Sequence, residues 1–102
     1  MHRIAVVAVP PVGTFELSIP DLIFGGVSLD GRPAYDVYAC TAKPGKVAST
    51  GGLDVVVSHG LASIDRAETV IVTGTGAREH ADPRVLTAVR RAARRGARIA
   101  SI

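Results

Sequence analysis

Two runs of aliphatic residues constrain the fold of this chain more than any other feature of its sequence. Residues 4–9 (IAVVAV) are apolar without interruption, and residues 69–73 (TVIVT) are aliphatic between two threonines. A strand whose side chains are apolar on both faces must be covered on both faces, as in a parallel sheet. Because such strands alternate here with helix signals, the sequence predicts a doubly wound α/β fold with right-handed crossovers.

Apolar spacing and turn residues predict the other elements. In chain order they are a helix at 20–27, strands at 35–41 and 53–58, a short helical stretch at 61–67, a helix at 82–96 and a last strand at 97–102. Pro20 suits the first turn of its helix, where no N–H is needed. No linker interrupts this order, so residues 1–102 are expected to belong to one domain.

The segment 82–96 carries a start signal, an end signal and five arginines. Asp82 suits the N-cap, and Gly96 suits the position just after the last turn. An apolar stripe is expected from Val85, Leu86, Val89, Ala92 and Ala93, with the arginines on the remaining surface. We interpret the arginines as a solvated helix face; contact with DNA or with an acidic partner is the alternative.

Composition and cysteine usage exclude several classes of protein. The chain has a single cysteine, Cys40, which excludes an internal disulfide framework, and its spacing of Cys and His predicts no metal site. Cys40 is expected to be a buried thiol rather than a nucleophile. The apolar run that ends at Pro10 is too short for a signal peptide or a membrane span. We therefore expect a cytoplasmic protein without a cofactor.

Parallel α/β sheets place their sites at the carboxyl ends of the strands, so the residues that follow each strand are the candidates. Glu16 is expected in the loop after the first strand, as an acid, a base or an orienting hydrogen-bond acceptor; a helix cap is the alternative. His59 follows the third strand. The candidates after the fourth strand are Gly74, Thr75, Gly76 and His80. Backbone N–H groups of this loop can line a small pocket, although its spacing departs from both the GxGxxG and the P-loop patterns.

Five segments of the chain carry a family resemblance. They are FELSIP at 15–20, STGGL at 49–53, SHGL at 58–61, TVIV at 69–72 and GARIASI at 96–102. Their order resembles the ThiJ/PfpI domain, which is class I glutamine-amidotransferase-like, in the form found at the N-terminus of AraC-type transcriptional regulators, including the AdpA-like group. The resemblance implies a flavodoxin-like fold, a homodimer, a small-molecule ligand and DNA binding only through a C-terminal module outside these residues.

In that family, the strand matching 97–102 runs into a sharp turn that usually opens with a nucleophilic cysteine, and the acidic residue matching Glu16 faces it. The resemblance therefore implies a nucleophile just after Ile102. Residues 1–102 are then expected to be the N-terminal part of one domain, in contact with the remainder of that domain.

The resemblance also bears on catalysis. Enzymes of the family carry Pro-Gly-Gly after the strand matching 69–73, whereas this chain reads Thr73-Gly74-Thr75-Gly76. Thr75 stands where the family has its second glycine, and a β-branched residue is poorly suited to a position that needs a positive φ. This departure favours a role in sensing and dimerisation over catalytic turnover. The alternative is a cysteine-dependent enzyme of the superfamily, such as an amidase, a hydrolase or an isonitrile-hydratase-like enzyme.

Overall fold

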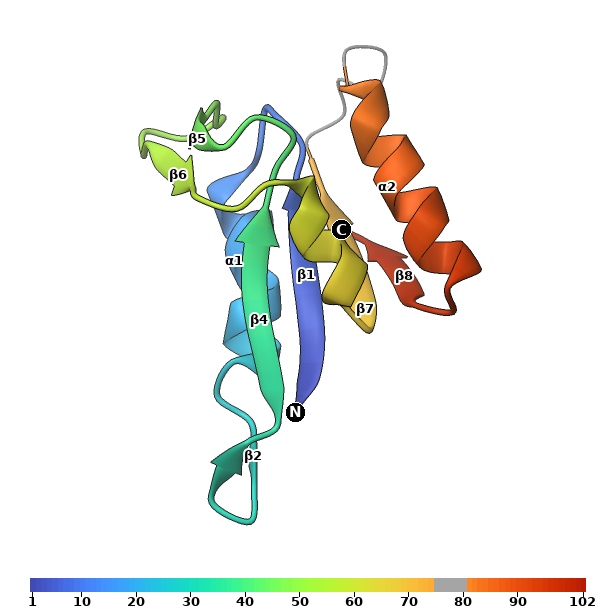
Figure 1. The fold of residues 1–102 in the computed structure, drawn as a ribbon. Coiled ribbons are helices and arrows are strands. Elements are labelled where there is room, and N and C mark those ends of the chain that lie inside the picture. Colours follow the sequence, from blue (N-terminus) through green and yellow to red (C-terminus); the bar gives the residue numbers. More distant parts are fainter. Residues whose placement is uncertain (75–80) are drawn as a thin grey trace.

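The computed structural model describes residues 1–74 and 81–102, and a four-stranded parallel sheet forms its centre (Figure 1). The strands are β1 (His2–Ala8), β4 (Tyr35–Cys40), β7 (Thr69–Thr73) and β8 (Arg98–Ser101). They lie in the order β4-β1-β7-β8, and every neighbouring pair is parallel. This order is that of a flavodoxin-like sheet, so the predicted fold class is confirmed.

Helices cover both faces of the sheet (Figure 1). α1 (Thr14–Phe24) packs on one face, while the 3₁₀ helix η1 (Leu61–Arg66) and α2 (Pro83–Arg94) pack together on the other. Side chains of β1 alternate between these layers: Ala5 and Val7 belong to the core beneath η1 and α2, and Ile4 and Val6 to the core beneath α1. The run at 4–9 is apolar because both of its faces are buried. Among the described residues, every helix is too short or too polar to span a membrane.

α1 begins at Thr14, six residues before the predicted start at Pro20. The prediction placed this proline in the first turn, whereas it lies inside the helix. Gly13 is the N-cap, and its carbonyl oxygen accepts from the N–H of Leu17 at 3.0 Å. Pro20 is buried in the helix interior, where it cannot donate to the carbonyl of Glu16. The prediction that placed Glu16 in a loop is therefore wrong: this residue lies in the first turn of α1.

Two small hairpins lie outside the central sheet. β2 (Ser28–Leu29) pairs with β3 (Arg32–Pro33), and β5 (Gly45–Val47) pairs with β6 (Val55–Val57). Residues 53–58 do contain a strand, as predicted. This strand, β6, pairs with β5 and is not part of the parallel sheet, so its predicted position in that sheet is wrong. Val56 is 70% exposed whereas Val57 is buried, which is the alternation of a hairpin covered on one face only.

α2 has the predicted boundaries. The carboxylate of Asp82 accepts from the backbone N–H of Arg84 at 2.9 Å, and Gly96 has a φ of +97° just beyond the last turn. The buried positions are Val85, Ala88 and Ala92, three residues at helical spacing. The predicted apolar stripe was only partly correct. It included two exposed residues, Leu86 and Ala93, and it omitted the buried Ala88.

Candidate functional site

A hollow of about 1070 Å³ opens at the carboxyl edge of the sheet. The ends of β1, β7 and β8 form its floor, and the N-terminal half of α2 forms one wall. Apolar side chains dominate its lining, and the few polar ones belong to Glu16, Thr73, Asp82 and Ser101. The strand order reverses between β1 and β7, next to this hollow, which is where parallel α/β sheets bind their ligands.

Glu16 lines this hollow from the first turn of α1 and is half-buried. A Cβ added at Gly13 would overlap the Glu16 carboxylate, so the glycine at the N-cap leaves room for this carboxylate. A negative charge in the first turn of a helix is also favoured by the helix dipole. The same side chain can therefore stabilise the start of α1 and offer an acceptor to the hollow.

Gly74 lines the hollow where the chain leaves β7. A Cβ added there would lie 3.1 Å from the carbonyl oxygen of Val9 and 3.3 Å from its Cβ, which is tighter than ordinary packing. Glycine therefore allows the ends of β7 and β1 to approach each other. The other predicted residues of this loop, Thr75, Gly76 and His80, lie outside the described residues.

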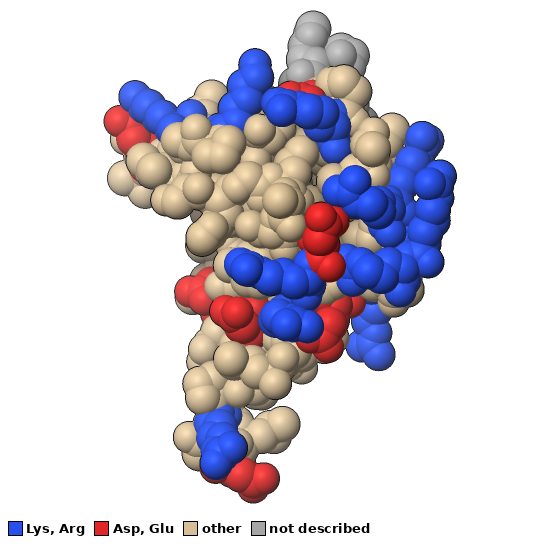
Figure 2. Space-filling view, viewed as in Figure 1, with Lys and Arg blue, Asp and Glu red and all other residues tan. Residues whose placement is uncertain are grey.

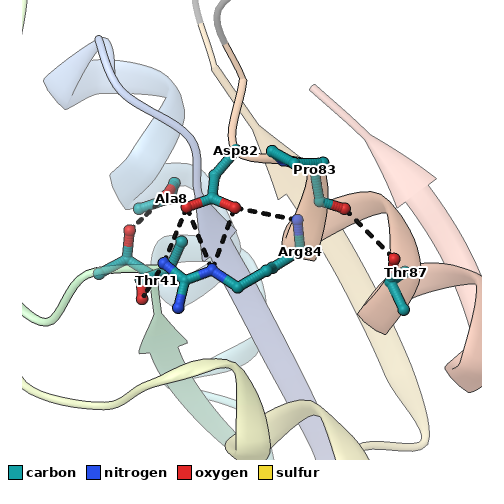
Figure 3. A network of polar contacts seen from close by, with 7 residues as sticks. Ala8, Thr41, Asp82, Pro83, Arg84 and Thr87 are labelled. Atoms are coloured by element: carbon teal, nitrogen blue, oxygen red, sulfur yellow. Dashed lines mark hydrogen bonds and ion pairs between the residues drawn. The ribbon is translucent and has the colours of Figure 1, made fainter.

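Polar contacts hold the strand ends beside the hollow (Figure 3). The buried hydroxyl of Thr41 donates to the carbonyl of Ala8 at 2.8 Å. The guanidinium of Arg84 donates to the Asp82 carboxylate at 2.8 Å and reaches the carbonyl of Ala42 at 3.4 Å. The side-chain hydrogen bond from Arg84, with the one from its backbone N–H, lowers the pKa of Asp82 to about 2. These contacts tie the ends of β1 and β4 to the start of α2.

Two other predicted residues lie away from the hollow. The side chain of His59 is exposed, and its backbone carbonyl accepts from the N–H of Thr41 at 3.0 Å. Cys40 is fully buried in the core beneath η1 and α2, and burial raises the pKa of its thiol to about 11. Cys40 is therefore a buried core thiol, as the sequence predicted. Within residues 1–74 and 81–102, no cluster of three or more His, Cys, Asp or Glu side chains could hold a metal ion.

The sequence did not reveal the contribution of α2 to the site. Leu86 and Val89, both predicted in the apolar stripe, line the hollow; Val89 also packs against the core, as predicted. Leu86 is 53% exposed, because the sheet needs only Val85, Ala88 and Ala92 for its cover. The signal in the sequence was that the apolar stripe of α2 is wider than the face that packs on the sheet. Of the two exposed residues in that stripe, Leu86 lines the hollow and Ala93 does not.

No protein-family model and no curated protein matches this sequence. Solved structures do match its fold. An AraC family transcriptional regulator from Pseudomonas putida superposes with a TM-score of 0.77 at 14% identity, over 99% of this chain and 64% of that one. A DJ-1 superfamily protein from Agrobacterium tumefaciens gives 0.71 at 17% identity, over 99% of this chain and 53% of that one. The chain has a DJ-1/ThiJ-like fold.

A proposed transcriptional regulator from Vibrio parahaemolyticus shares this DJ-1/ThiJ-like fold, with a TM-score of 0.72, 17% identity and coverage of 99% of this chain and 56% of that one. The chain spans between 53% and 64% of the length of these three structures. At such low identities the likeness shows the fold alone. It agrees with the ThiJ/PfpI resemblance drawn from the sequence.

Proposed function

We propose that residues 1–102 are the N-terminal part of the ligand-sensing and dimerisation domain of an AraC-type transcriptional regulator of the AdpA-like group, without catalytic turnover. The observation that carries this proposal is the structural likeness to the AraC family regulator from Pseudomonas putida over 99% of the chain. Sequence-specific DNA contacts then belong to a C-terminal module outside residues 1–102. A regulator of this kind works in the cytoplasm.

The hollow at the carboxyl edge supports the sensing role. Its volume of about 1070 Å³ is slightly above the usual range for a small-molecule site, roughly 300–1,000 Å³, and its lining is mainly apolar with few polar groups. We assign Glu16 and Gly74 to ligand binding, with Thr75, Gly76 and His80 of the loop that follows. A carboxylate in an apolar site selects a ligand with an apolar body and a hydrogen-bond donor or a positive charge.

Exposed apolar side chains support the two associations that this proposal requires. On the outer side of α1, Phe15, Leu22 and Ile23 are 69%, 73% and 58% exposed, and such patches mark interaction surfaces. We assign this side of α1 to contact with a second copy. On β8, Ile99 is exposed and the outer backbone edge is unpaired among the described residues, which suits contact with the remainder of the same domain.

One observation favours the alternative, a cysteine-dependent enzyme of the superfamily. Glu16 and Ile102 line the same hollow, so a nucleophile just after Ile102 would lie on the side of the sheet that holds a carboxylate. In nucleophilic catalysis an adjacent base activates the nucleophile by taking its proton, and a carboxylate can act as that base.

Two experiments on the full-length protein test the proposal. The first selects the duplexes that the protein binds and footprints it on them, and the second assays turnover of simple amides and isonitriles. The expected result is a sequence-selective footprint and no turnover. Turnover that is lost in Glu16→Gln, together with no selected duplex, would establish the enzyme instead. Leu86→Glu, which places a charge in the hollow, is expected to alter the ligand response of the regulator while leaving its footprint in place.

A further inference from the structure

Positive charge is concentrated on one side of the molecule, along α2 (Figure 2). η1 and the segment 82–95 together contain six arginines and two aspartates, whereas the whole chain has a net charge of +3. α2 itself contains no carboxylate. We define the arginine face as Arg66, Arg90, Arg91, Arg94 and Arg95. Outside this region the chain is close to electrically neutral, so the charge is a local feature.

Arg91 and Arg95 are held in place by η1 and the residue that follows it, and Arg66, which belongs to η1, is held by β4. The guanidinium of Arg95 donates to the carbonyl oxygens of Ile64 and Ala67, both at 2.9 Å. Arg91 donates to Asp65 at 3.2 Å. Arg66 lies 5.1 Å from the centre of the Tyr38 ring. Guanidinium groups that are already ordered lose less freedom when they bind an anion.

The other two arginines point away from the protein core. Arg90 and Arg94 are four residues apart on the side of α2 opposite the buried Val85, Ala88 and Ala92. Both are exposed, and neither has a carboxylate partner among the residues that the structure describes. Their axial separation is about 6 Å from helix geometry. Two like charges this close repel each other, and an anionic partner would relieve that repulsion.

The chemistry of this surface fits a phosphate backbone better than a protein. Protein interfaces are built around an apolar core with aromatic anchors, and α2 carries no aromatic residue. Its large exposed apolar residue, Leu86, lies on the flank that faces the hollow. Single-stranded nucleic acid would also need aromatic side chains for base stacking. Guanidinium groups pair well with phosphate oxygens, which follow one another closely along duplex DNA.

We propose that the arginine face contacts the phosphate backbone of duplex DNA without reading its sequence. This inference rests on the proposed function, which brings the domain close to DNA through the C-terminal module. It goes beyond the expectation that only that module contacts DNA. Backbone contacts of this kind fix the position of a protein on the duplex, while specificity comes from elsewhere.

The test measures how salt weakens the binding of a fluorescent random-sequence duplex to the full-length protein, over roughly 50 to 200 mM salt. Each phosphate contact contributes about 0.9 to the slope of log affinity against log salt. The variant Arg90→Gln with Arg94→Gln is expected to lower that slope by about 2. Arg90→Lys with Arg94→Lys keeps both charges and is expected to keep most of the slope.

A matched control removes the same charge elsewhere, through Arg32→Gln with Lys46→Gln on the two hairpins. A slope that falls much less in this control supports the proposal. An equal fall in both double variants would overturn it, because net charge alone would then explain binding. An unchanged slope in Arg90→Gln with Arg94→Gln would overturn it too, even if these changes abolished binding to an acidic protein. If the wild-type protein shows no sequence-selective footprint, the proposed function fails separately, whatever the slopes show.

Discussion

The two helices that cover the sheet differ in what they present to the outside. α2 buries Val85, Ala88 and Ala92 and carries arginines on its outer surface. α1 also buries one side against the sheet, but its outer side exposes large apolar residues, among them Phe15, Leu22 and Ile23. A helix that is apolar on both sides is normally buried on both sides. The comparison indicates that the outside of α1 is suited to contact with protein and that the outside of α2 is suited to water or to phosphate.

The largest effect is expected from a change beneath η1 and α2. Ile64 is fully buried there, so Ile64→Ala should lower the free energy of unfolding by roughly 2–5 kcal/mol through lost burial and a cavity. Leu22→Ala, on the outside of α1, removes a similar volume from an exposed position. Urea unfolding of monomeric protein should show a change below about 0.5 kcal/mol for Leu22→Ala. Equal losses in the two variants would contradict the assigned layers.

The next effect concerns association. Leu22→Glu places a charge in the apolar outer side of α1, and Arg90→Glu is its control on the outer side of α2. We expect Leu22→Glu to weaken self-association at least about tenfold, because an unpaired charge would be desolvated at the interface. Sedimentation equilibrium of the full-length protein measures this directly. A dimer that survives Leu22→Glu but dissociates with Arg90→Glu would reverse the roles of the two helices.

The smallest effect is the acid sensitivity of the start of α2. Arg84 lowers the pKa of Asp82 to about 2 in the folded chain, whereas an unperturbed aspartate titrates near 4. A lowered pKa contributes stability above the unfolded value, and this contribution is lost as the pH falls from about 4 to about 2. Asp82→Asn retains a capping side chain without the charge. Its thermal midpoint should lie about 1–3 °C below the wild type at pH 6 and approach it near pH 2. A constant difference across this pH range would contradict the assignment.

How far the sequence predicts this structure depends on how local each feature is. The ends of α2 follow from Asp82 and Gly96, whose effects act within one helical turn, and both were predicted correctly. The start of α1 was missed because a proline suits a first turn better than a helix interior, and packing of the buried Pro20 outweighs that preference. The place of β6 depends on which strand it pairs with, and a run of three valines does not encode its partner.

The candidate site was predictable only in part for the same reason. The rule that sites lie at strand ends identified Glu16 and Gly74, and the structure brings both to one hollow. Leu86 belongs to the same hollow and is exposed, but the sequence assigned it to the apolar stripe because it cannot show which flank of α2 the sheet leaves open. The roles of Glu16 and Gly74 in binding stay predictions.

Hydroxyl-radical footprinting of the full-length protein, with and without duplex DNA, tests the contrast between the two helices most directly. Phe15, Leu22 and Ile23 are highly exposed in the isolated chain, so they should be reactive only if nothing covers α1. We predict that these three side chains are protected in the absence of DNA, and that the α2 segment becomes protected only when duplex is added. Full reactivity of α1 in the free protein, with an α2 segment that DNA leaves unchanged, would contradict the account.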